Sequence, residues 1–583
     1  MTKTIRQALL LIFSVIAANA GAQSFEHLRI NQVGLQPDQE KILVVDASIS
    51  QAAKLLKKSV IIRGVDNKFK KSFPITRKVT SPISQKERFI VDFSTVNKPG
   101  KYEAIVGKER IPFVIAEHPL HEISKSALKA FYLIRSGVDI EEKYAGVYAR
   151  KKAHADTHVL IHPSAATENR PEGTVISSPY GWYDAGDYNK YVVNSAFACA
   201  QMLMAYEQNK AYFDKLVVDI PESSNRTPDI LDEVMFNLKW MLTMQDTDDG
   251  GVYHKLTTPS FEGMVMPADC HQQRYVVRKT VTAAYDFAAV MALAARIYKG
   301  STDYPEFSAK ASAAALKAYA WAKEHPNDFY RQNEMNKHFD PDVTTGEYGD
   351  MNARDEQFWA STELYLLTQE QSYLQEATNL RPQQYMMPVW GNVNGLGLQE
   401  WVATGNSSEM CQYSQRLLKS FCESLIKDVS TASFQSPYGN KAFDFGWGCL
   451  AEQCCNQAIT LLYGDKYIEK GKYLKYALAN ANYLLGCNAT GYCYVTGFGV
   501  KSPKNIHHRI SYADGIDEPF PGLLAGGPNP AQQDKSDQLR YASNYADESY
   551  EDQTASYASN EIAINWNSAL VSMMGGLDAA SMK

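Results

Sequence analysis

PDILDEVMFNLKWMLTMQ, residues 228–245, is the stretch that decides the fold of most of this chain. At a period of 3.6 residues, one face collects the apolar side chains Ile230, Leu231, Val234, Leu238, Met241 and Leu242. Pro228 stands where a helix can begin, because proline is tolerated in the first turn. The stretch therefore predicts an amphipathic helix that packs its apolar face against a core.

The same helical texture recurs along the chain after His118. It is seen in residues 123–137, 192–209, 281–299 and 310–325, and again near 354–369, 413–427, 449–463, 470–486 and 560–578. Long loops rich in Gly, Pro, Asn and aromatic residues separate these segments, and loops of that length in a compact domain are usually functional. We expect a large all-α domain over residues 120–583.

Residues 25–117 have a different pattern. Runs such as LRINQVGL, KILVVDAS and RFIVDFS are short and rich in Val, Ile and Phe, and turn residues such as NKPGK separate them. Six such runs in under a hundred residues predict a small β-sandwich. A chain of 583 residues is long enough for this sandwich and a second domain.

The N-terminus has the features of a signal peptide over residues 1–22. Lys3 and Arg6 precede the apolar run ALLLIFSVIAANA, and small residues lead to a cleavage site near Ala22. No other long apolar stretch follows, so no membrane span is expected. We expect a protein exported to the periplasm or beyond, and the sequence does not decide between these.

The net charge and the cysteine content limit which ligands and which covalent links we expect. The net charge of -6 gives no reason to expect nucleic acid as a ligand. The nine cysteines all lie from Cys199 onward, and an odd number without CxxC spacing predicts buried thiols rather than a disulfide framework. The oligomeric state is left open.

GWYDAGDYNKY, residues 181–191, places Asp184 and Asp187 three residues apart among aromatic rings. Close like charges raise each other's pKa, so a metal or partner relieves them or the site uses them. Inverting hydrolysis of a glycosidic bond needs an acid and a base roughly 6.5–9.5 Å apart, which a D-x-x-D pair cannot supply alone. Both aspartates could hold one water while a third carboxylate acts as acid. Taken alone, such a pair is more often a solvated or capping pair.

Several familiar motifs are missing: G-x-S-x-G, H-E-x-x-H and the P-loop do not occur. The remaining motifs are NQVG (31–34), DAGDYNKYV (184–192), VTGFG (495–499), HHRISYADG (507–515) and YEDQTASYASNEIAINWNS (550–568). Together they resemble glycoside hydrolase family 9, the cellulase family with an (α/α)6 barrel and, in one branch, an N-terminal immunoglobulin-like domain. The resemblance covers nearly the whole mature chain.

The resemblance implies roles for three carboxylates. Asp187 would be the general base, Asp184 would help to hold and polarise the attacking water, and Glu561 would be the general acid. The family inverts the anomeric configuration in one displacement. Glu561 must then stay protonated near neutral pH, so apolar neighbours should raise its pKa.

The resemblance also implies supporting residues. His507 and Arg509 would grip sugar hydroxyls near the cleavage point, and Asp552 and Tyr557 would support that wall. Trp447, in FGWGC, resembles a sugar platform of the family, although a core tryptophan fits the same letters.

Two further tryptophans and two charged residues have less specific interpretations. Trp390 and Trp401 lie in a polar stretch and could line the cleft. Arg354 and Glu363 read as salt-bridge or surface groups of the barrel.

Of the metal ligands that the family resemblance implies, this sequence keeps only some. Related enzymes hold a structural zinc with two Cys and two His before the DAGD segment. This chain has Ser136, Ala153 and Tyr183 there and keeps only His154, so zinc is not expected. Calcium is common in the family, but the sequence does not place its ligands, and the chemistry requires no cofactor.

We therefore predict an exported inverting endo-β-1,4-glucanase for soluble or amorphous β-glucan: cellulose chains, mixed-linkage glucan or the xyloglucan backbone. No carbohydrate-binding module follows the last helix, which argues against crystalline cellulose. One alternative is an exo-acting cellodextrinase or β-glucosidase-like enzyme on the same fold. A non-catalytic glycan-binding protein is the other, and the presence of all three carboxylates speaks against it. The sandwich is expected to brace the barrel.

Overall fold

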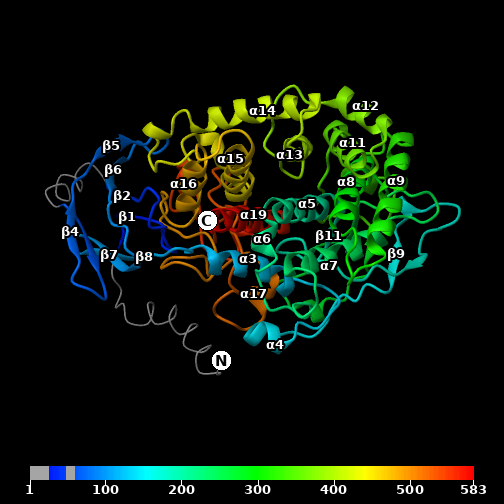
Figure 1. Cartoon of the computed structure of the whole chain (residues 1–583). Helices are drawn as coiled ribbons and strands as arrows, with labels where there is room; N and C mark the ends of the chain where they lie inside the picture. Colours follow the sequence, from blue (N-terminus) through cyan, green and yellow to red (C-terminus); the bar gives the residue numbers. More distant parts are fainter. Residues whose placement is uncertain (1–24, 48–58, 583) are drawn as a thin grey trace.

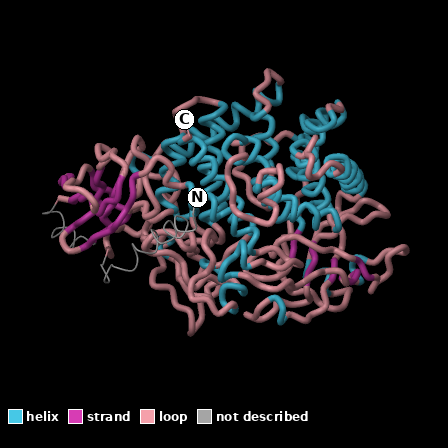
Figure 2. Tube along the Cα trace, turned by 60° about the horizontal axis from the view of Figure 1, so that its bottom comes forward, coloured by secondary structure: helices cyan, strands magenta, loops and turns pink. Residues whose placement is uncertain are grey.

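The computed structural model describes residues 25–47 and 59–582, which form a strand-rich part beside a larger helical part (Figures 1 and 2). The expected signal peptide lies outside the described residues. Among the described helices, none combines the length and apolar character needed to cross a membrane.

The strand-rich part is a β-sandwich of two four-stranded sheets, with strand orders β1-β2-β6-β5 and β4-β3-β7-β8. The strands are β1 (Leu28–Arg29), β2 (Ile42–Ala47), β3 (Val60–Gly64), β4 (Lys70–Phe73), β5 (Arg77–Thr80), β6 (Glu87–Asp92), β7 (Gly100–Val106) and β8 (Glu109–Ile115). Alternate residues point inward, and Leu43, Val91, Ile62 and Phe113 meet in one core. Strands β4 and β5 were not predicted from the sequence, because these edge strands are rich in Lys, Arg and Ser and largely face solvent.

The helical part is an (α/α)6 barrel. Its inner helices are α5 (Val192–Gln208), α8 (Val281–Ile297), α11 (Arg354–Thr368), α13 (Asn394–Ala403), α15 (Asn456–Tyr467) and α19 (Ile564–Ser581). Contacts run from α5 through α8, α11, α13 and α15 to α19 and back to α5, which closes the ring. Most side chains of α5, α8 and α19 are buried, as expected for helices that are apolar on all sides.

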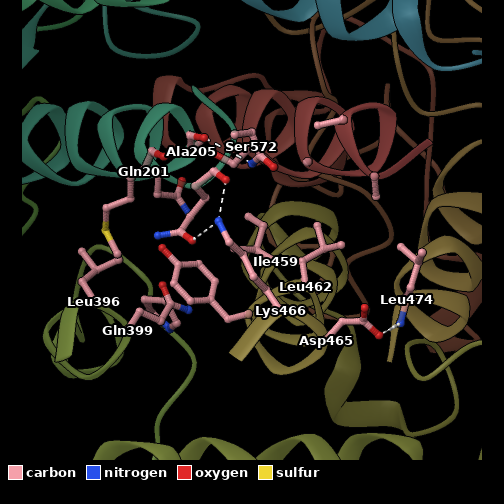
Figure 3. A pocket seen from close by; sticks show the side chains of 18 of the residues that line it. Gln201, Ala205, Leu396, Gln399, Ile459, Leu462, Asp465, Lys466, Leu474 and Ser572 are labelled. Carbon is pink, nitrogen blue, oxygen red and sulfur yellow. Dashed lines mark hydrogen bonds between the residues drawn. The ribbon is translucent and has the colours of Figure 1, made fainter. Parts of the chain in front are cut away.

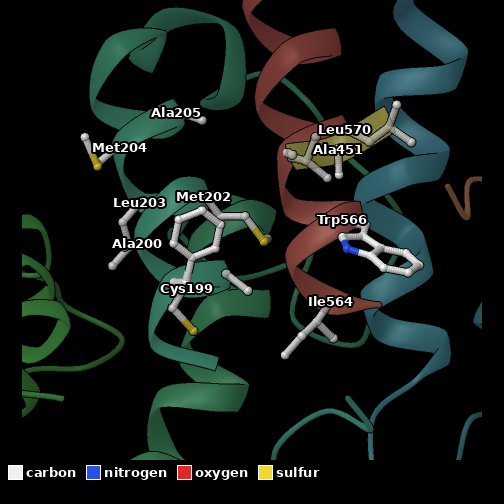
Figure 4. Close-up of a cluster of buried hydrophobic side chains, with 14 of the residues drawn as sticks. Cys199, Ala200, Met202, Leu203, Met204, Ala205, Ala451, Ile564, Trp566 and Leu570 are labelled. Atoms are coloured by element: carbon white, nitrogen blue, oxygen red, sulfur yellow. The ribbon is translucent and has the colours of Figure 1, made fainter. Parts of the chain in front are cut away.

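The outer helices pack on this ring, and short helices fill the loops. The outer helices are α3 (His121–Leu133), α7 (Asp229–Thr243), α9 (Phe307–Glu324), α12 (Gln371–Leu380), α14 (Glu409–Ile426) and α16 (Leu474–Leu484). The short helices are α4 (Glu142–Ala145), α6 (Lys210–Phe213), α10 (Gln332–Asn336), α17 (Arg509–Ala513) and α18 (Tyr557–Asn560). Figure 4 shows the apolar side chains that gather where α5 and α19 meet, among them Met202, Trp566 and Leu570.

Helices α12 and α13 were not predicted from the sequence. Helix α12 is mostly polar, and only Ala377 is buried in it. Helix α13 contains Gly395 and Gly397, which read as loop residues. At Gly397 a Cβ would lie 2.7 Å from Phe358 Cε1, so close packing of α13 on α11 requires glycine.

A small sheet, also missed from the sequence, supports the loops at one end of the barrel. Its order is β10-β9-β13-β12-β11. The strands are β9 (Val159–Ile161), β10 (Val175–Ile176), β11 (Lys190–Tyr191), β12 (Lys255–Thr257) and β13 (Tyr275–Val276). Strand β11 leads from the paired aspartates directly into α5, so the sheet fixes where those aspartates lie.

The sandwich docks on the barrel through buried polar contacts. The side-chain oxygen of Gln32, in the NQVG motif, accepts from the amides of Val500 (2.9 Å) and Lys501 (3.0 Å). Arg88 of β6 is fully buried and lies 3.3 Å from Asp547 Oδ2 and 4.5 Å from the centre of the Phe434 ring. The sandwich thereby contacts the segments before and after the HHR motif.

Candidate active site

A cavity of about 860 Å³ lies where the inner helices begin. It brings together seven of the eight predicted site residues: Asp184, Asp187, Trp447, His507, Arg509, Tyr557 and Glu561. The two aspartates come from residues 184–187, and the other five come from residues 447–561, more than two hundred residues later in the chain. Inner-helix N-termini converge here, since Tyr191 caps α5 and Ala563 caps α19.

The two aspartates are buried and held by neutral donors. Asp187 Oδ2 accepts from Asn189 Nδ2 (2.6 Å) and from the Tyr191 hydroxyl (3.1 Å). Asp184 accepts from Asn194 Nδ2 (2.8 Å) and the Tyr348 hydroxyl (2.7 Å). Burial, and then the charge of Asp187, raises the pKa of Asp184. The pair therefore resists carrying two full charges.

Tyr348 is a site residue that sequence reasoning missed. It lies in the loop before α11, with φ at +45°, a left-handed conformation that non-glycine residues seldom adopt. Such strain persists where the surroundings hold it, often at functional sites. Here the hydroxyl meets Asp184, 164 residues away in sequence. No local pattern marks this tyrosine, because only the tertiary fold brings it to Asp184.

Glu561 lies in extended backbone between α18 and α19. Burial, and then the charge of Asp187, raises the pKa of Glu561 to about 8, while hydrogen bonding from the Gly186 amide and the charge of Arg509 oppose this rise. The carboxyl group is therefore protonated at neutral pH, the state that a general acid needs.

Gly186 lies where the aspartate loop meets the C-terminal motifs. Its amide donates to Glu561 Oε1 at 3.3 Å. A Cβ on this residue would lie 2.5 Å from the His507 carbonyl oxygen and 3.0 Å from Glu561 Oε1. Only glycine fits at this crossing of the aspartate loop and the C-terminal segments. This explains why a glycine stands between Asp184 and Asp187.

His507 and Arg509 lie at the same crossing. Arg509 donates from Nη1 to the Gly186 carbonyl (2.6 Å) and from Nε to the Glu262 carbonyl (2.9 Å), so part of its guanidinium holds the loops together. His507 donates from Nδ1 to the Thr554 carbonyl at 2.7 Å. Burial lowers the pKa of His507, which favours the neutral ring.

Aromatic side chains line the cavity. Trp447 is 43% exposed and Tyr557 36% exposed, and their ring centres are 5.6 Å apart. Trp390 is half-buried and packs edge-on against Tyr348. Phe261, which sequence reasoning missed, lies over the Arg509 guanidinium at 5.5 Å. These rings offer apolar faces of the kind that stack on sugars.

Trp401 is not part of the cavity. It is 1% exposed in α13, and its Nε1 donates to Thr362 Oγ1 at 3.1 Å. The expectation that it could line the cleft is wrong, because the stretch that reads as polar forms a buried helix.

Asp552 does not line the cavity but supports its wall. It accepts from the amide of Asn505 (2.8 Å) and from Asn560 Nδ2 (3.1 Å), and so links the residues before His507 to those before Glu561.

Glu363 forms the expected barrel salt bridge, 2.7 Å from Arg296.

Glu452 is a third missed residue. It lines the cavity from a turn of π-helix, η6 (Leu450–Cys455), a rare conformation that often marks functional sites. Burial raises the pKa of Glu452 to about 7.

All nine cysteines, three of them in or beside this segment, are free thiols, as the sequence indicated.

A second hollow of about 500 Å³ lies at the opposite ends of α5 and α19, between Gln201, Leu396, Leu462 and Ser572 (Figure 3). Asp465 at its rim accepts from the Leu474 amide at 2.9 Å. The hollow lacks a pair of facing carboxylates, so the hydrolytic chemistry belongs to the larger cavity.

Two regions bear on metal binding. In the region where the family resemblance implied a zinc site, Ser136 Oγ donates to the Tyr180 carbonyl (3.0 Å) and His154 Nδ1 lies 2.9 Å from the Tyr183 hydroxyl. Elsewhere, at the start of α11, four carboxylates lie close together: Asp286, Asp350, Asp355 and Glu356. Burial and mutual repulsion raise the pKa of Asp286 and Glu356, and both oxygens of each lack a partner among the described residues.

Comparisons with known proteins agree with this geometry. The profile of glycosyl hydrolase family 9 matches residues 121–574, and that of the cellulase N-terminal Ig-like domain matches residues 23–110. A xyloglucan-specific endo-β-1,4-glucanase of Bacteroides ovatus is 49% identical over 95% of this chain and 94% of its own length. Endoglucanase D of Acetivibrio thermocellus is 31% identical over 94% of this chain and 83% of its own. A solved family 9 structure from Bacteroides ovatus superposes with a TM-score of 0.90 at 48% identity, covering 95% of this chain and 99% of that one.

Proposed function

This chain belongs to glycosyl hydrolase family 9 and is an inverting endo-β-1,4-glucanase, and we propose that the β-glucan it cuts is xyloglucan. The observation that carries the choice of substrate is the similarity, over nearly the full length of both chains, to a xyloglucan-specific enzyme. The partly exposed rings of Trp447 and Tyr557 support it, since they offer stacking faces within a cleft that remains accessible.

The residue roles are part of the proposal. Asp187 removes one proton from a water that Asp184 helps to hold, and the water oxygen bonds to the anomeric carbon. The glycosidic C–O bond breaks as Glu561 donates its proton to the leaving oxygen. The products are a sugar of inverted anomeric configuration and a chain with a free 4-hydroxyl. Asp187 then releases its proton to solvent, and Glu561 regains one.

The electrostatics of the cavity support these roles. The raised pKa of Glu561 keeps a proton available for the leaving group. The neutral donors on Asp184 and Asp187 hold both carboxylates without a cation in hydrogen-bond contact among the described residues. The attacking water therefore does not have to compete with a side-chain ammonium for the two carboxylates.

A substrate panel tests the proposal. Initial rates on xyloglucan, mixed-linkage glucan and carboxymethyl cellulose should be highest on xyloglucan, and products of mixed intermediate length should appear early. NMR of the first product should show the inverted anomer. Equal or higher rates on the unbranched glucans would refute the substrate assignment. Release of a single sugar from one end would instead indicate exo action.

We also propose that calcium binds the carboxylate cluster near α11, where Asp286 and Glu356 have partnerless oxygens. Oxygen ligands of this kind suit calcium. Among the described residues, no three His, Cys, Asp or Glu side chains are placed to hold one ion together. The ion would therefore take at most two of these carboxylates and complete its shell with backbone or water oxygens. Its role would be structural, because it neutralises buried carboxylates that do not themselves line the cavity.

Export is the remaining proposal. The basic start, apolar run and small residues of positions 1–22 support it, and so does the polymeric substrate.

A further inference from the structure

Lys255 is a buried lysine directly behind the cavity. It lies in β12 with its side chain fully buried. Its Nζ donates to Gln332 Oε1 (2.7 Å), Thr345 Oγ1 (3.0 Å) and the Gly346 carbonyl (2.6 Å). Three acceptors satisfy all three N–H groups of an ammonium, so the surroundings are built for the charged form.

The residue is tied to both aspartates of the cavity. On one side, Lys255 pairs across the sheet with Tyr191, whose hydroxyl donates to Asp187. On the other, it anchors Thr345 and Gly346, and the same loop carries Tyr348 to Asp184. The Lys255 ammonium also lies 5.6 Å from the centre of the Tyr191 ring, so its side chain contacts both elements that hold the aspartate pair.

The charged groups that act on Lys255 are carboxylates. Burial lowers the pKa of Lys255 to about 7, and the carboxylates of Asp187 and Glu347 oppose this fall. His254, the residue before this strand, is kept neutral because burial lowers its pKa to about 3. The pKa of His162 is lowered too, and the remaining neighbours are the rings of Tyr191 and Tyr330. The ammonium is therefore the buried cation that acts on Asp187 from this side.

We propose that Lys255 is a positioning residue for hydrolysis: it holds the Tyr191 and Tyr348 supports of the aspartate pair and keeps one carboxylate of the pair ionised. The inference rests on the proposed function of that pair. Without the ammonium, the pair takes up a proton more readily. The acid limb of the pH–rate profile should then move to higher pH, and the supporting loop should loosen.

The test compares Lys255→Met and Lys255→Arg with a matched control. Lys190, on the neighbouring strand, is equally buried, but its Nζ binds Asp156 (2.7 Å) and the Tyr180 carbonyl (2.7 Å) outside the cavity. Lys190→Met should lower the melting temperature without moving the acid limb. Lys255→Met should lower kcat by about tenfold or more and move the acid limb of kcat up by about one pH unit. Lys255→Arg should keep the wild-type limb.

Two outcomes would overturn the inference. One is an unchanged acid limb in folded Lys255→Met, and the other is an equal shift in Lys190→Met. If Lys255→Met does not fold, Thr345→Val carries the test, because it removes one anchor and keeps the charge. Thr345→Val should lower kcat without moving the acid limb of the pH–rate profile. A wild-type kcat in this variant would refute the positioning role. A wild-type enzyme inactive on every glucan would instead refute the proposed function.

Discussion

The backbone amide of Gly186 donates to Glu561 Oε1 at 3.3 Å, which joins the loop of the two aspartates to the carboxyl group on the other wall of the cavity. The Arg509 guanidinium holds the same residue through its carbonyl group. The acid and the water-binding pair are thus parts of one cross-braced unit, although 375 residues separate Gly186 from Glu561.

The crossing predicts that Gly186→Ala damages catalysis more than folding. The new Cβ would lie 2.5 Å from the His507 carbonyl oxygen, and overpacking of this kind costs about 1–3 kcal/mol. We expect kcat to fall at least about tenfold, because small misplacements of reacting groups are expensive. Steady-state kinetics and thermal melting check this. Gly446→Ala, where a Cβ meets nothing within 4 Å, is the matched control. Wild-type kcat in Gly186→Ala would contradict the close crossing.

Glu561→Gln should remove the proton donor and keep the shape of the side chain. We expect kcat on xyloglucan to fall by about 10²–10⁴-fold. Aryl glycosides whose leaving group needs no proton should be affected much less. In the wild type, activity should fall as pH rises through about 8, because the acid must be protonated and that is the pKa of Glu561. A basic limb unchanged in Glu561→Gln, or equal losses on both substrate types, would refute its role as acid.

The sandwich should stabilise the enzyme through Arg88. Arg88→Met leaves Asp547 and Asp46 buried beside an uncharged side chain, and breaking a buried pair costs about 3–5 kcal/mol. Denaturant unfolding measures the loss. Arg63, whose pair with Glu103 is partly exposed, is the control, and Arg63→Met should cost no more than about 1 kcal/mol. Equal effects of the two substitutions would mean that the buried network does not brace the barrel.

Calcium should raise the melting temperature, and chelation should lower it. In the absence of a cation, burial and mutual repulsion hold the pKa values of Asp286 and Glu356 well above their usual range. Their neutral forms are lost as pH rises, so stability falls and the calcium effect should grow with pH. Calcium at a hundredfold excess over Kd would add about 2.7 kcal/mol.

The calcium response has a matched control. Asp286→Asn should abolish it, while Asp232→Asn, a buried carboxyl bonded to Tyr304 and Asn225, should leave it intact. If neither calcium nor chelator changes melting while stability falls with rising pH, protons alone neutralise the cluster.

Much of the fold was predictable because its signals are local. Helix periodicity in residues 228–245 and the alternating pattern of β3 and β7 depend on neighbouring residues, so both domains were recognisable. Elements with weak local signals were not. The charged edge strands β4 and β5 resemble surface loops, and α13 was concealed by glycines that only its packing on α11 explains.

The sequence by itself determined the chemical inventory: two aspartates at fixed spacing, a distant glutamate, and a glycine between the aspartates. It also determined that most helices would be amphipathic, because the side-chain order sets the buried face of each. Only the tertiary structure decided which groups would support those carboxylates. Tyr348 reaches the cavity from a loop and Glu452 from a π-helical turn, while Lys255 lies behind the cavity on a strand, and no local pattern marks any of them. The pKa of Glu561 was likewise decided there, because burial and the nearby charge of Asp187 arise only when remote segments pack together.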